Sequence, residues 1–295
     1  MRRFILFLFM GCLTVTSGRA QQGEPALARV IYEFMHINDT LQPDKPYKEE
    51  MVLYIGQHAT SYDTYSLERV NQQIKSQMED PAFDGNLTLR GSGSTTKESY
   101  YIQPEERRIK QLYRLAGEIY VVDEDYPAID WQVADETKEI GGYDVQKATG
   151  RFRGRDYTAW FTTALPFQAG PWKLQGLPGL VLEASDHRGE VFFRYAGFET
   201  LKEGEATLSL PENAITTNKK ALDKLKKGYQ KNPQAAMNAR SRAGASSSGG
   251  GATTVKFGGS SGNMDISDPS RIKSINVIRD DGQASPVTNN PIELE

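Results

Sequence analysis

The stretch LVLEASDHRGEVFFRY, residues 180–195, predicts the hairpin at the centre of the fold. Residues 180–184 (LVLEA) are mostly apolar, and residues 191–195 (VFFRY) combine a β-branched residue with three aromatic residues, which favours strands. Asp186 begins the turn between them, and Gly189 supplies the positive φ that a hairpin loop commonly needs. We therefore expect two antiparallel strands joined by a short loop.

Further short apolar segments lie on both sides of this hairpin. Because turn residues separate them and helices do not alternate with them, they predict antiparallel strands. The predicted strands cover residues 30–37, 51–55, 99–102, 109–115, 119–122, 157–162 and 272–278. The chain is therefore expected to be mainly β, with a curved antiparallel sheet in the form of a half-open barrel or a sandwich.

One or two helices are expected to cover this sheet. Apolar residues recur at helical spacing over residues 67–78, and Ser66 is a candidate N-cap. A second helix is predicted over residues 218–227, with Thr217 as its N-cap and Gly228 after its end. Its lysines suit a solvated face and a helix C-terminus better than they indicate an anionic partner.

Residues 1–20 have the pattern of a signal peptide, with two arginines, a short apolar run and small residues before a cleavage site after Ala20. Cys12 leaves a lipid anchor as the less favoured alternative. The apolar run is far shorter than the roughly 20 residues that span a membrane, so no transmembrane segment is expected. The protein is expected to be exported and to reside in the periplasm or at the outer membrane.

The composition excludes several classes of partner. The 295 residues include 35 Lys and Arg and 38 Asp and Glu, for a net charge of −3, which falls to −6 once the three arginines of residues 1–20 are removed. Without a basic surplus, nucleic acid is not an expected partner. Cleavage after Ala20 also removes the single cysteine, and with it any disulfide or cysteine-bound metal.

The chain divides into one main domain, a linker and a returning tail. Residues 21–231 are expected to form the β-rich domain. Residues 232–270 are rich in Gly, Ser and Ala and too poor in apolar residues to offset the entropy of ordering, which predicts a flexible linker. Residues 271–295 are expected to bring a strand and a tail back to the main domain, since loop closure becomes costly only slowly with length.

The run GPWKLQGLPGLVLEASD, residues 170–186, resembles the GLPGLI family of exported Bacteroidetes proteins, also known as Porph_ging. Supporting matches are QKAT at 146–149, RFRGR at 151–155, AWF at 159–161 and NPIEL at 290–294. Val145 departs from the family, because many relatives have a cysteine there. The resemblance implies an exported β-rich protein, but it implies no established activity and no catalytic residues.

The GLPGL motif, which consists of Gly176, Leu177, Pro178, Gly179 and Leu180, predicts a structural turn. Leu177 is driven towards extended backbone by the proline that follows it, and Pro178 fixes φ near the value of the second turn position. Gly179 accepts the positive φ of the third position in a type II turn. The motif is therefore expected to lead into the strand that begins at Leu180.

A binding role for the same region is the alternative. Trp172 and Leu174 can fold back over the sheet as an apolar flap. Beside Trp160, Trp172 and Phe161, the glycine-rich loop can form the rim of an apolar pocket. Trp160, Trp172 and Leu174 are the candidate contacts for a ligand or a partner.

No residue pattern indicates catalytic, cofactor-binding or metal-binding residues. His36, His58 and His187 lie in three separate segments without the spacing of metal ligands. Glu183 and Asp186 are carboxylates of the kind that serves as acid and base, but the sequence does not place them face to face. No cofactor or metal is expected.

The leading hypothesis is a non-enzymatic binding or assembly protein of the cell envelope, whose apolar groove holds an apolar ligand or an envelope protein. One alternative is an envelope hydrolase that uses carboxylates or His58 on the concave face, and another is a structural partner in an outer-membrane complex. In addition, Asp39, Thr40 and Leu41 match the Asp-Thr-apolar pattern on which Bacteroidetes attach O-linked glycans. Thr40 is therefore a candidate glycosylation site.

Overall fold

A computed structural model describes residues 23–91, 96–232, 269–279, 284–285 and 287–294. The predicted signal peptide with Cys12 lies outside these residues, and so does nearly all of the predicted linker. Among the described residues, no helix is long and apolar enough to cross a membrane.

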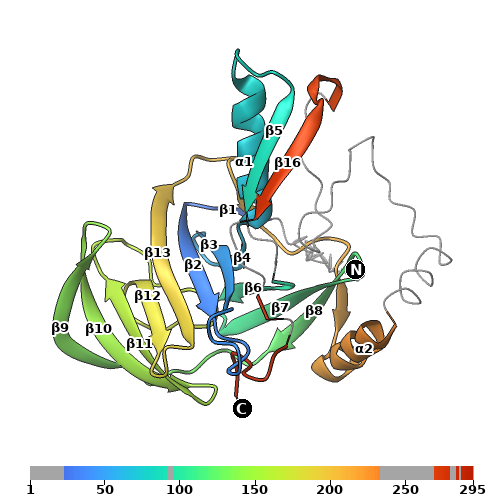
Figure 1. Ribbon diagram of the computed structural model, residues 1–295. Coiled ribbons are helices and arrows are strands. Elements are labelled where there is room, and N and C mark those ends of the chain that lie inside the picture. The colour runs from blue at the N-terminus through green and yellow to red at the C-terminus, as the bar shows by residue number, and fades with distance from the viewer. Residues whose placement is uncertain (1–22, 92–95, 233–268, 280–283, 286, 295) are drawn as a thin grey trace, which may run out of the picture.

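The architecture is one open, curved sheet of twelve strands (Figure 1). In order across the sheet the strands are β15 (Ile215–Thr217), β8 (Glu118–Glu124), β7 (Arg108–Leu115), β6 (Glu98–Gln103), β4 (Thr60–Thr64), β3 (Tyr47–Ile55), β2 (Ala28–His36), β13 (Val191–Thr200), β12 (Leu180–Asp186), β11 (Arg155–Thr162), β10 (Tyr143–Phe152) and β9 (Gln132–Ile140). Neighbouring strands are antiparallel, except that β15 runs parallel to β8. The prediction of a mainly β, curved antiparallel sheet with covering helices is confirmed.

The predicted hairpin at residues 180–195 is confirmed as β12 and β13, which pair at Ala184 and Phe193. Asp186 shapes its turn, because its Oδ1 accepts the backbone N–H groups of Glu190 at 2.7 Å and Val191 at 2.9 Å. β13 then pairs with the whole of β2. The hairpin thus joins the two halves of the sheet.

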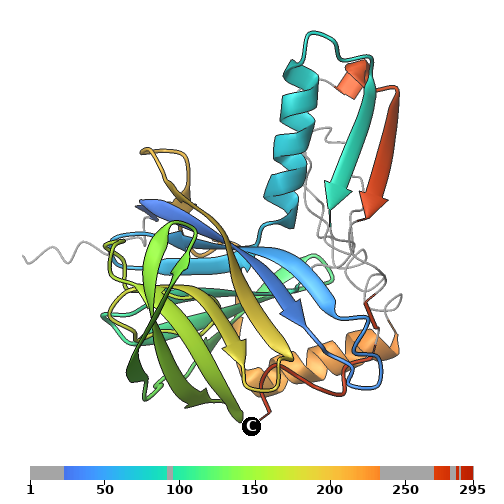
Figure 2. The same ribbon diagram turned by 60° about the vertical axis from the view of Figure 1, so that its left-hand side comes forward.

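A small unit projects from the sheet and consists of α1 (Ser66–Glu79), β5 (Asn86–Gly91) and β16 (Ser274–Arg279) (Figure 2). β16 pairs with β5 in parallel, although the two strands are far apart in the sequence. The unit has its own small core, formed by Val70, Ile74, Met78, Leu87 and Leu89. A 3-10 turn, η1 (Pro269–Arg271), precedes β16, and elsewhere β1 (Glu24–Pro25) pairs with β14 (Thr207–Leu208).

Both predicted helices are present, but neither predicted cap is correct. Ser66 lies inside α1, and its hydroxyl donates to the carboxylate of Glu49 at 3.2 Å instead of capping the helix. The second helix is α2 (Lys219–Lys231), and its cap is Asn218, whose side chain accepts the backbone N–H of Ala221 at 2.9 Å. α2 also continues through Gly228, since a glycine inside a helix weakens it without ending it.

Residues 163–179 cover the inner face of the sheet. Trp172, Leu174 and Leu177 are buried in the main core together with Phe161 and Phe193. The Trp172 ring stacks on that of Phe193 with centroids 6.3 Å apart. This segment therefore replaces the second layer that an open sheet needs in order to bury its apolar face.

The glycines of this segment are required for close backbone approach. A Cβ atom on Gly179 would lie 2.2 Å from the carbonyl oxygen of Thr162, and one on Gly170 would lie 2.1 Å from that of Leu174. The expected positive φ at Gly179 is wrong, because the positive φ occurs at Gly176, where it is +99°. Gly179 is needed for contact with β11, and Gly176 is needed for the turn.

The tail that includes residues 287–294 lies against the end of the main sheet through two buried cations. The Arg155 guanidinium donates to the carbonyl oxygens of Pro291 and Ile292 and to the side chains of Asp186 and Asn290. Lys173, whose side chain is 2% exposed, pairs with Glu124 of β8 and with Glu293 of the tail. Each buried charge therefore has partners, as stability requires.

The close approach at Gly179 can be tested by substitution. Gly179→Ala should lower the free energy of unfolding by about 3 kcal/mol, because the added Cβ forces the inner segment away from β11. Gly197→Ala is the control, since a Cβ at that position meets nothing within 4 Å, and it should change stability by less than about 1 kcal/mol. Urea denaturation measures both, and equal stabilities of the two variants would contradict the steric argument.

Candidate functional site

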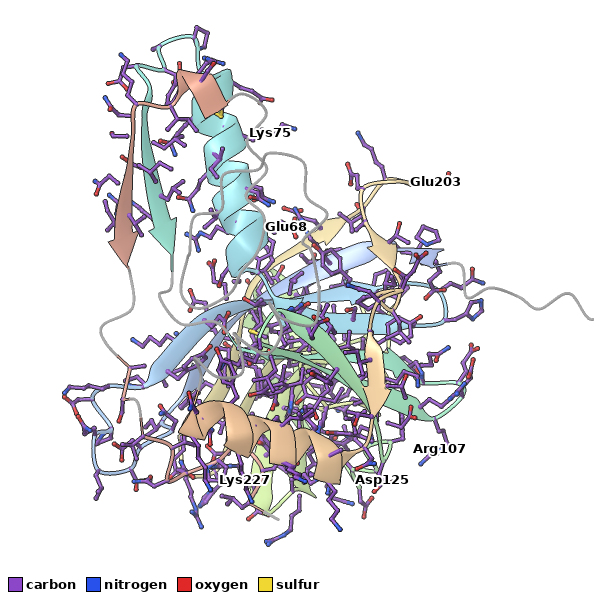
Figure 3. The ribbon with its side chains drawn as sticks, turned by 90° about the vertical axis from the view of Figure 1, so that its right-hand side faces the viewer. Glu68, Lys75, Arg107, Asp125, Glu203 and Lys227 are labelled. Carbon is purple, nitrogen blue, oxygen red and sulfur yellow. The ribbon has the colours of Figure 1, made fainter. Side chains whose placement is uncertain are left out.

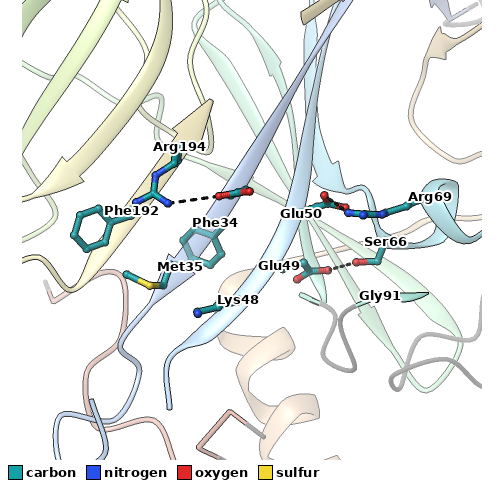
Figure 4. A pocket seen from close by; sticks show the side chains of 11 residues that line it. Phe34, Met35, Lys48, Glu49, Glu50, Ser66, Arg69, Gly91, Phe192 and Arg194 are labelled. Carbon is teal, nitrogen blue, oxygen red and sulfur yellow. Dashed lines mark hydrogen bonds and ion pairs between the residues drawn. The ribbon is translucent and has the colours of Figure 1, made fainter. Parts of the chain in front are cut away.

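The candidate site is a groove of about 360 Å³ where β13, β2 and β3 meet the start of α1 (Figure 4). Its lining consists of Glu33, Phe34, Met35, Lys48, Glu49, Glu50, Ser66, Arg69, Gly91, Phe192 and Arg194. Four strands (β2, β3, β5 and β13) and helix α1 thus contribute to it.

Strand register arranges part of this lining in two rows. Arg194 lies opposite Glu33, and Glu33 lies opposite Glu50, which forms the charged row. Two residues further along each strand, Phe192 lies opposite Met35 and Met35 opposite Lys48; we call Phe192 and Met35 the apolar row. Because side chains at i and i+2 share a face, the two rows are parallel and about 7 Å apart.

The charged row forms ion pairs that water can reach. Glu33 and Arg194 are 3.6 Å apart with side chains 60% and 62% exposed, and Glu50 pairs with Arg69 of α1. Exposed pairs of this kind contribute little to stability, typically below about 1 kcal/mol. Their hydrogen-bonding groups can therefore exchange one partner for another at little cost to the fold.

Glu49 is the buried acid of the groove. Its carboxylate accepts the hydroxyls of Tyr47, Thr64 and Ser66 and the backbone N–H of Thr96 at 2.7 Å. Burial raises the pKa of the Glu49 carboxyl above its ordinary value, although these donors oppose the shift. Since a carboxylate has about four acceptor sites, Glu49 has none left for a substrate. Its role in the structure is to tie β3 to α1 and to the chain that follows β5.

The structure does not bring the three predicted contact residues together. Trp172 and Leu174 are buried in the core. Trp160 lies on the opposite face of the sheet, where its ring lies under the ammonium group of Lys138 at 4.4 Å and that of Lys147 at 5.9 Å. The fold therefore uses Trp172 and Leu174 for packing, and Trp160 remains the accessible member of the set.

The residues of the hydrolase alternative do not converge either. Asp186 is buried against Arg155, whereas Glu183 pairs with Lys138 at 2.6 Å on the other face of the sheet. His58 lies exposed in the turn between β3 and β4. Within the described residues, no three His, Cys, Asp or Glu side chains are grouped so that they could hold a metal ion.

Thr40 lies in the exposed loop between β2 and β3. Its backbone N–H and its hydroxyl both donate to the side-chain oxygen of Asn289, at 2.9 and 3.2 Å. Its neighbour Leu41 is 84% exposed, so a modifying enzyme can reach the segment from solvent. Glycosylation of Thr40 stays a prediction.

The groove residues were not predicted from the sequence. The segments IYEFMH at 31–36 and YKEE at 47–50 contain charged residues inside strands, which is an unusual pattern for strands of a central sheet. These charged residues inside strands were the feature of the sequence that could have indicated a functional surface. The sequence did not reveal which strands would lie beside each other and align these charges.

His36 ends β2 beside the Arg155 network. Its side chain is 7% exposed, and its Nε2 has no hydrogen-bond partner among the described residues. Burial, reinforced by the charge of Arg155, lowers the pKa of His36 from 6.5 to about 4. The folded protein therefore keeps His36 neutral under conditions in which the unfolded chain binds a proton.

Comparison with known proteins identifies one related domain. Residues 82–227 match the family model described as the N-terminal domain of N-glycanase peptide, PNGase F-II. Two solved structures of PNGF-II, in the P21 and C2 space groups, are 17% and 16% identical to this chain, with TM-scores of 0.47 and 0.46. Each alignment covers 68% of this chain but only 33% and 32% of the PNGF-II chains. A search of curated proteins finds no match.

These findings correct the expected family. The resemblance to the GLPGLI family is wrong, because the family model that matches is the N-glycanase N-terminal domain and the GLPGLI family is not matched. The physical reason lies in the motif. Its glycines are required locally for close backbone approach and for a positive φ. Unrelated loops have the same requirements, so the motif on which the resemblance centred is weak evidence of ancestry.

The role of Glu49 predicts different effects for two substitutions. Glu49→Ala should destabilise the protein by about 3 kcal/mol, because it leaves buried donors without an acceptor. Glu49→Gln retains the shape of the side chain and one acceptor oxygen, and it removes a buried charge. It should therefore lower the free energy of unfolding by about 1 kcal/mol or less. Thermal and urea denaturation at pH 7 measure both effects. A larger loss for Gln than for Ala would show that Glu49 is not a structural anchor.

The lowered pKa of His36 predicts a pH dependence of stability. Because the folded-state pKa is below the unfolded value, this stability is present above pH 6.5 and is lost as the pH falls towards about 4. Over this pH range the free energy of unfolding should fall by about 2–3 kcal/mol. His36→Gln should flatten the profile between pH 6.5 and 4 in urea titrations. His58→Gln, at an exposed histidine, is the control, and an equal effect of both substitutions would refute the assignment.

Proposed function

We propose that the protein is a non-enzymatic binding protein of the cell envelope or exterior that recognises the sugar portion of glycosylated proteins. The observation that carries this proposal is the pairing of an apolar row with a charged row across β13, β2 and β3. The match to the N-terminal domain of an N-glycanase supports it, because that domain belongs to a protein named for its action on N-glycans.

The groove has the two chemical features that a sugar ring requires. A pyranose has an apolar face of C–H groups and a rim of hydroxyls that both donate and accept hydrogen bonds. Phe192 and Met35 offer an apolar platform, whereas Glu33 and Glu50 offer acceptors and Arg194 offers donors. Ligand sites typically combine an apolar lining with a few polar groups that fix orientation.

Binding is favoured over hydrolysis by the state of the carboxylates. Glu49 is saturated with donors, and Glu33 and Glu50 each lie beside an arginine. A general acid must be free to deliver a proton to the bond being cleaved, whereas these three carboxylates are held in hydrogen bonds or ion pairs. We therefore assign glycan recognition, and not glycan cleavage, to the protein.

Calorimetric titration with an N-glycosylated peptide tests the proposal. Wild-type protein should bind the glycopeptide and not the same peptide after deglycosylation. Phe192→Ala and Arg194→Ala should each weaken binding about tenfold or more, because they remove the platform and the donor of the groove.

Trp160→Ala is the matched control. It removes a partly exposed aromatic residue that lies outside the groove, so the variant should bind like the wild type. If wild-type protein does not distinguish the glycosylated from the bare peptide, the proposal fails. If Trp160→Ala abolishes binding and Phe192→Ala does not, the site lies on β11 instead.

A further inference from the structure

A stripe of lysines runs along α2. Lys220, Lys224, Lys227 and Lys231 are exposed and follow one another at intervals of four, three and four residues. With Lys219, Asp223 and Gly228 they line a hollow on the surface of the helix, so five of its seven lining residues are lysines. Figure 3 shows α2 on the outside of the molecule, with Lys227 labelled on it.

The stripe faces directly away from the body of the protein. At 100° per residue, its four lysines fall within about 60° of the helix circumference. Leu222 and Lys226 lie on the opposite side, where Leu222 is buried and the Lys226 ammonium group lies 3.8 Å from the centroid of the Tyr113 ring. The helix is thus held by one side and presents its cations on the other.

Intrinsic helix stability does not explain this arrangement. Like charges four residues apart destabilise a helix by a few tenths of a kcal/mol, and Lys220–Lys224 and Lys227–Lys231 are two such pairs. Lys219 and Lys220 lie in the first turn, where the helix dipole disfavours cations, and that turn has no acidic residue. The interpretation of these lysines as stabilising charges at a helix C-terminus therefore holds for Lys231 alone.

Asp223 is the single acidic residue among those that line the hollow, so the face keeps a cationic surplus within the part of the chain that the structure describes. Lys226 pairs with Glu98, whereas the four stripe lysines form no ion pair with a described carboxylate. The whole chain has a net charge of −3, so this cationic face is a local concentration on an acidic protein. Such a surface attracts an anionic partner from solution.

We propose that this lysine stripe docks the protein on an anionic phospholipid membrane. Lysine ammonium groups are point charges on flexible stems, which suit a fluid layer of phosphate headgroups, whereas shape-specific recognition of phosphate favours arginine. A stripe of about 16 Å along one outward helix face can contact a flat surface with all four charges at once. Each lysine near an anionic leaflet adds to the attraction. This inference is independent of the glycan groove.

Sedimentation with vesicles tests it on the full chain. The protein should bind vesicles of phosphatidylglycerol and phosphatidylethanolamine in equal parts, and not vesicles of phosphatidylcholine. The quadruple variant Lys220→Gln, Lys224→Gln, Lys227→Gln, Lys231→Gln should bind about tenfold or more weakly. Raising the salt from about 0.05 M to about 0.5 M should release the wild type, because salt screens exposed charges.

The control removes the same net charge elsewhere on the surface. The variant Lys45→Gln, Lys75→Gln, Lys202→Gln, Lys273→Gln loses four exposed lysines outside α2 and should bind like the wild type. The stripe variant should also be at least as stable as the wild type in urea, since it removes like-charge repulsion. This separates lost binding from lost folding.

Three outcomes overturn the inference. The wild type fails to bind the anionic vesicles, the stripe variant binds them as the wild type does, or the control variant loses binding equally. Retention on immobilised heparin without vesicle binding would assign the stripe to a soluble polyanion instead of a membrane. None of these outcomes bears on the glycopeptide titration, so the two proposals fail separately.

Discussion

The fold depends on how an open sheet buries its inner face. A sheet of twelve strands that does not close must cover its apolar side, and here the segment 163–179 supplies the most deeply buried part of that cover. That segment approaches β11 so closely that the Gly179 position has no room for a Cβ atom beside Thr162. The contact brings Trp172 into the stack with Phe193 and thereby joins β13 to the inner layer. Hydrophobic burial supplies the driving force, and the glycine makes the geometry possible.

Two buried cations then position the covering segment and the tail. Lys173 lies within the covering segment and reaches both β8 and the tail, while Arg155 links the hairpin turn to the same tail. A buried charge without partners is strongly unfavourable, so each cation holds several chain segments in one arrangement. The tail thus completes the main sheet, because its carbonyls and Glu293 satisfy charges that are already buried there.

The strands with apolar alternation were predictable from the sequence, whereas the polar ones were not. The hairpin at residues 180–195 combines two short apolar segments with Asp186 and Gly189, so local chemistry was sufficient. β9 is exposed along nearly its whole length and forms an edge of the sheet, where charges discourage pairing with other chains. Its sequence therefore lacked the alternation on which the prediction relied. Lys173 and Arg155 were also missed, because cations are normally exposed and their burial depends on partners that are distant in the sequence.

The candidate groove was unpredictable for a different reason. Its rows exist only because β13 pairs with β2 in one register, and a shift of one residue would turn Phe192 and Arg194 to the other face. The side chains that form both proposed surfaces contribute little to folding, since the ion pairs of the groove are exposed and the lysines of α2 repel one another. The rows of the groove and the lysine stripe of α2 are regular arrangements that stability does not explain, which is why we assign functions to them. Trp172 and Leu174, in contrast, are fully accounted for by the core.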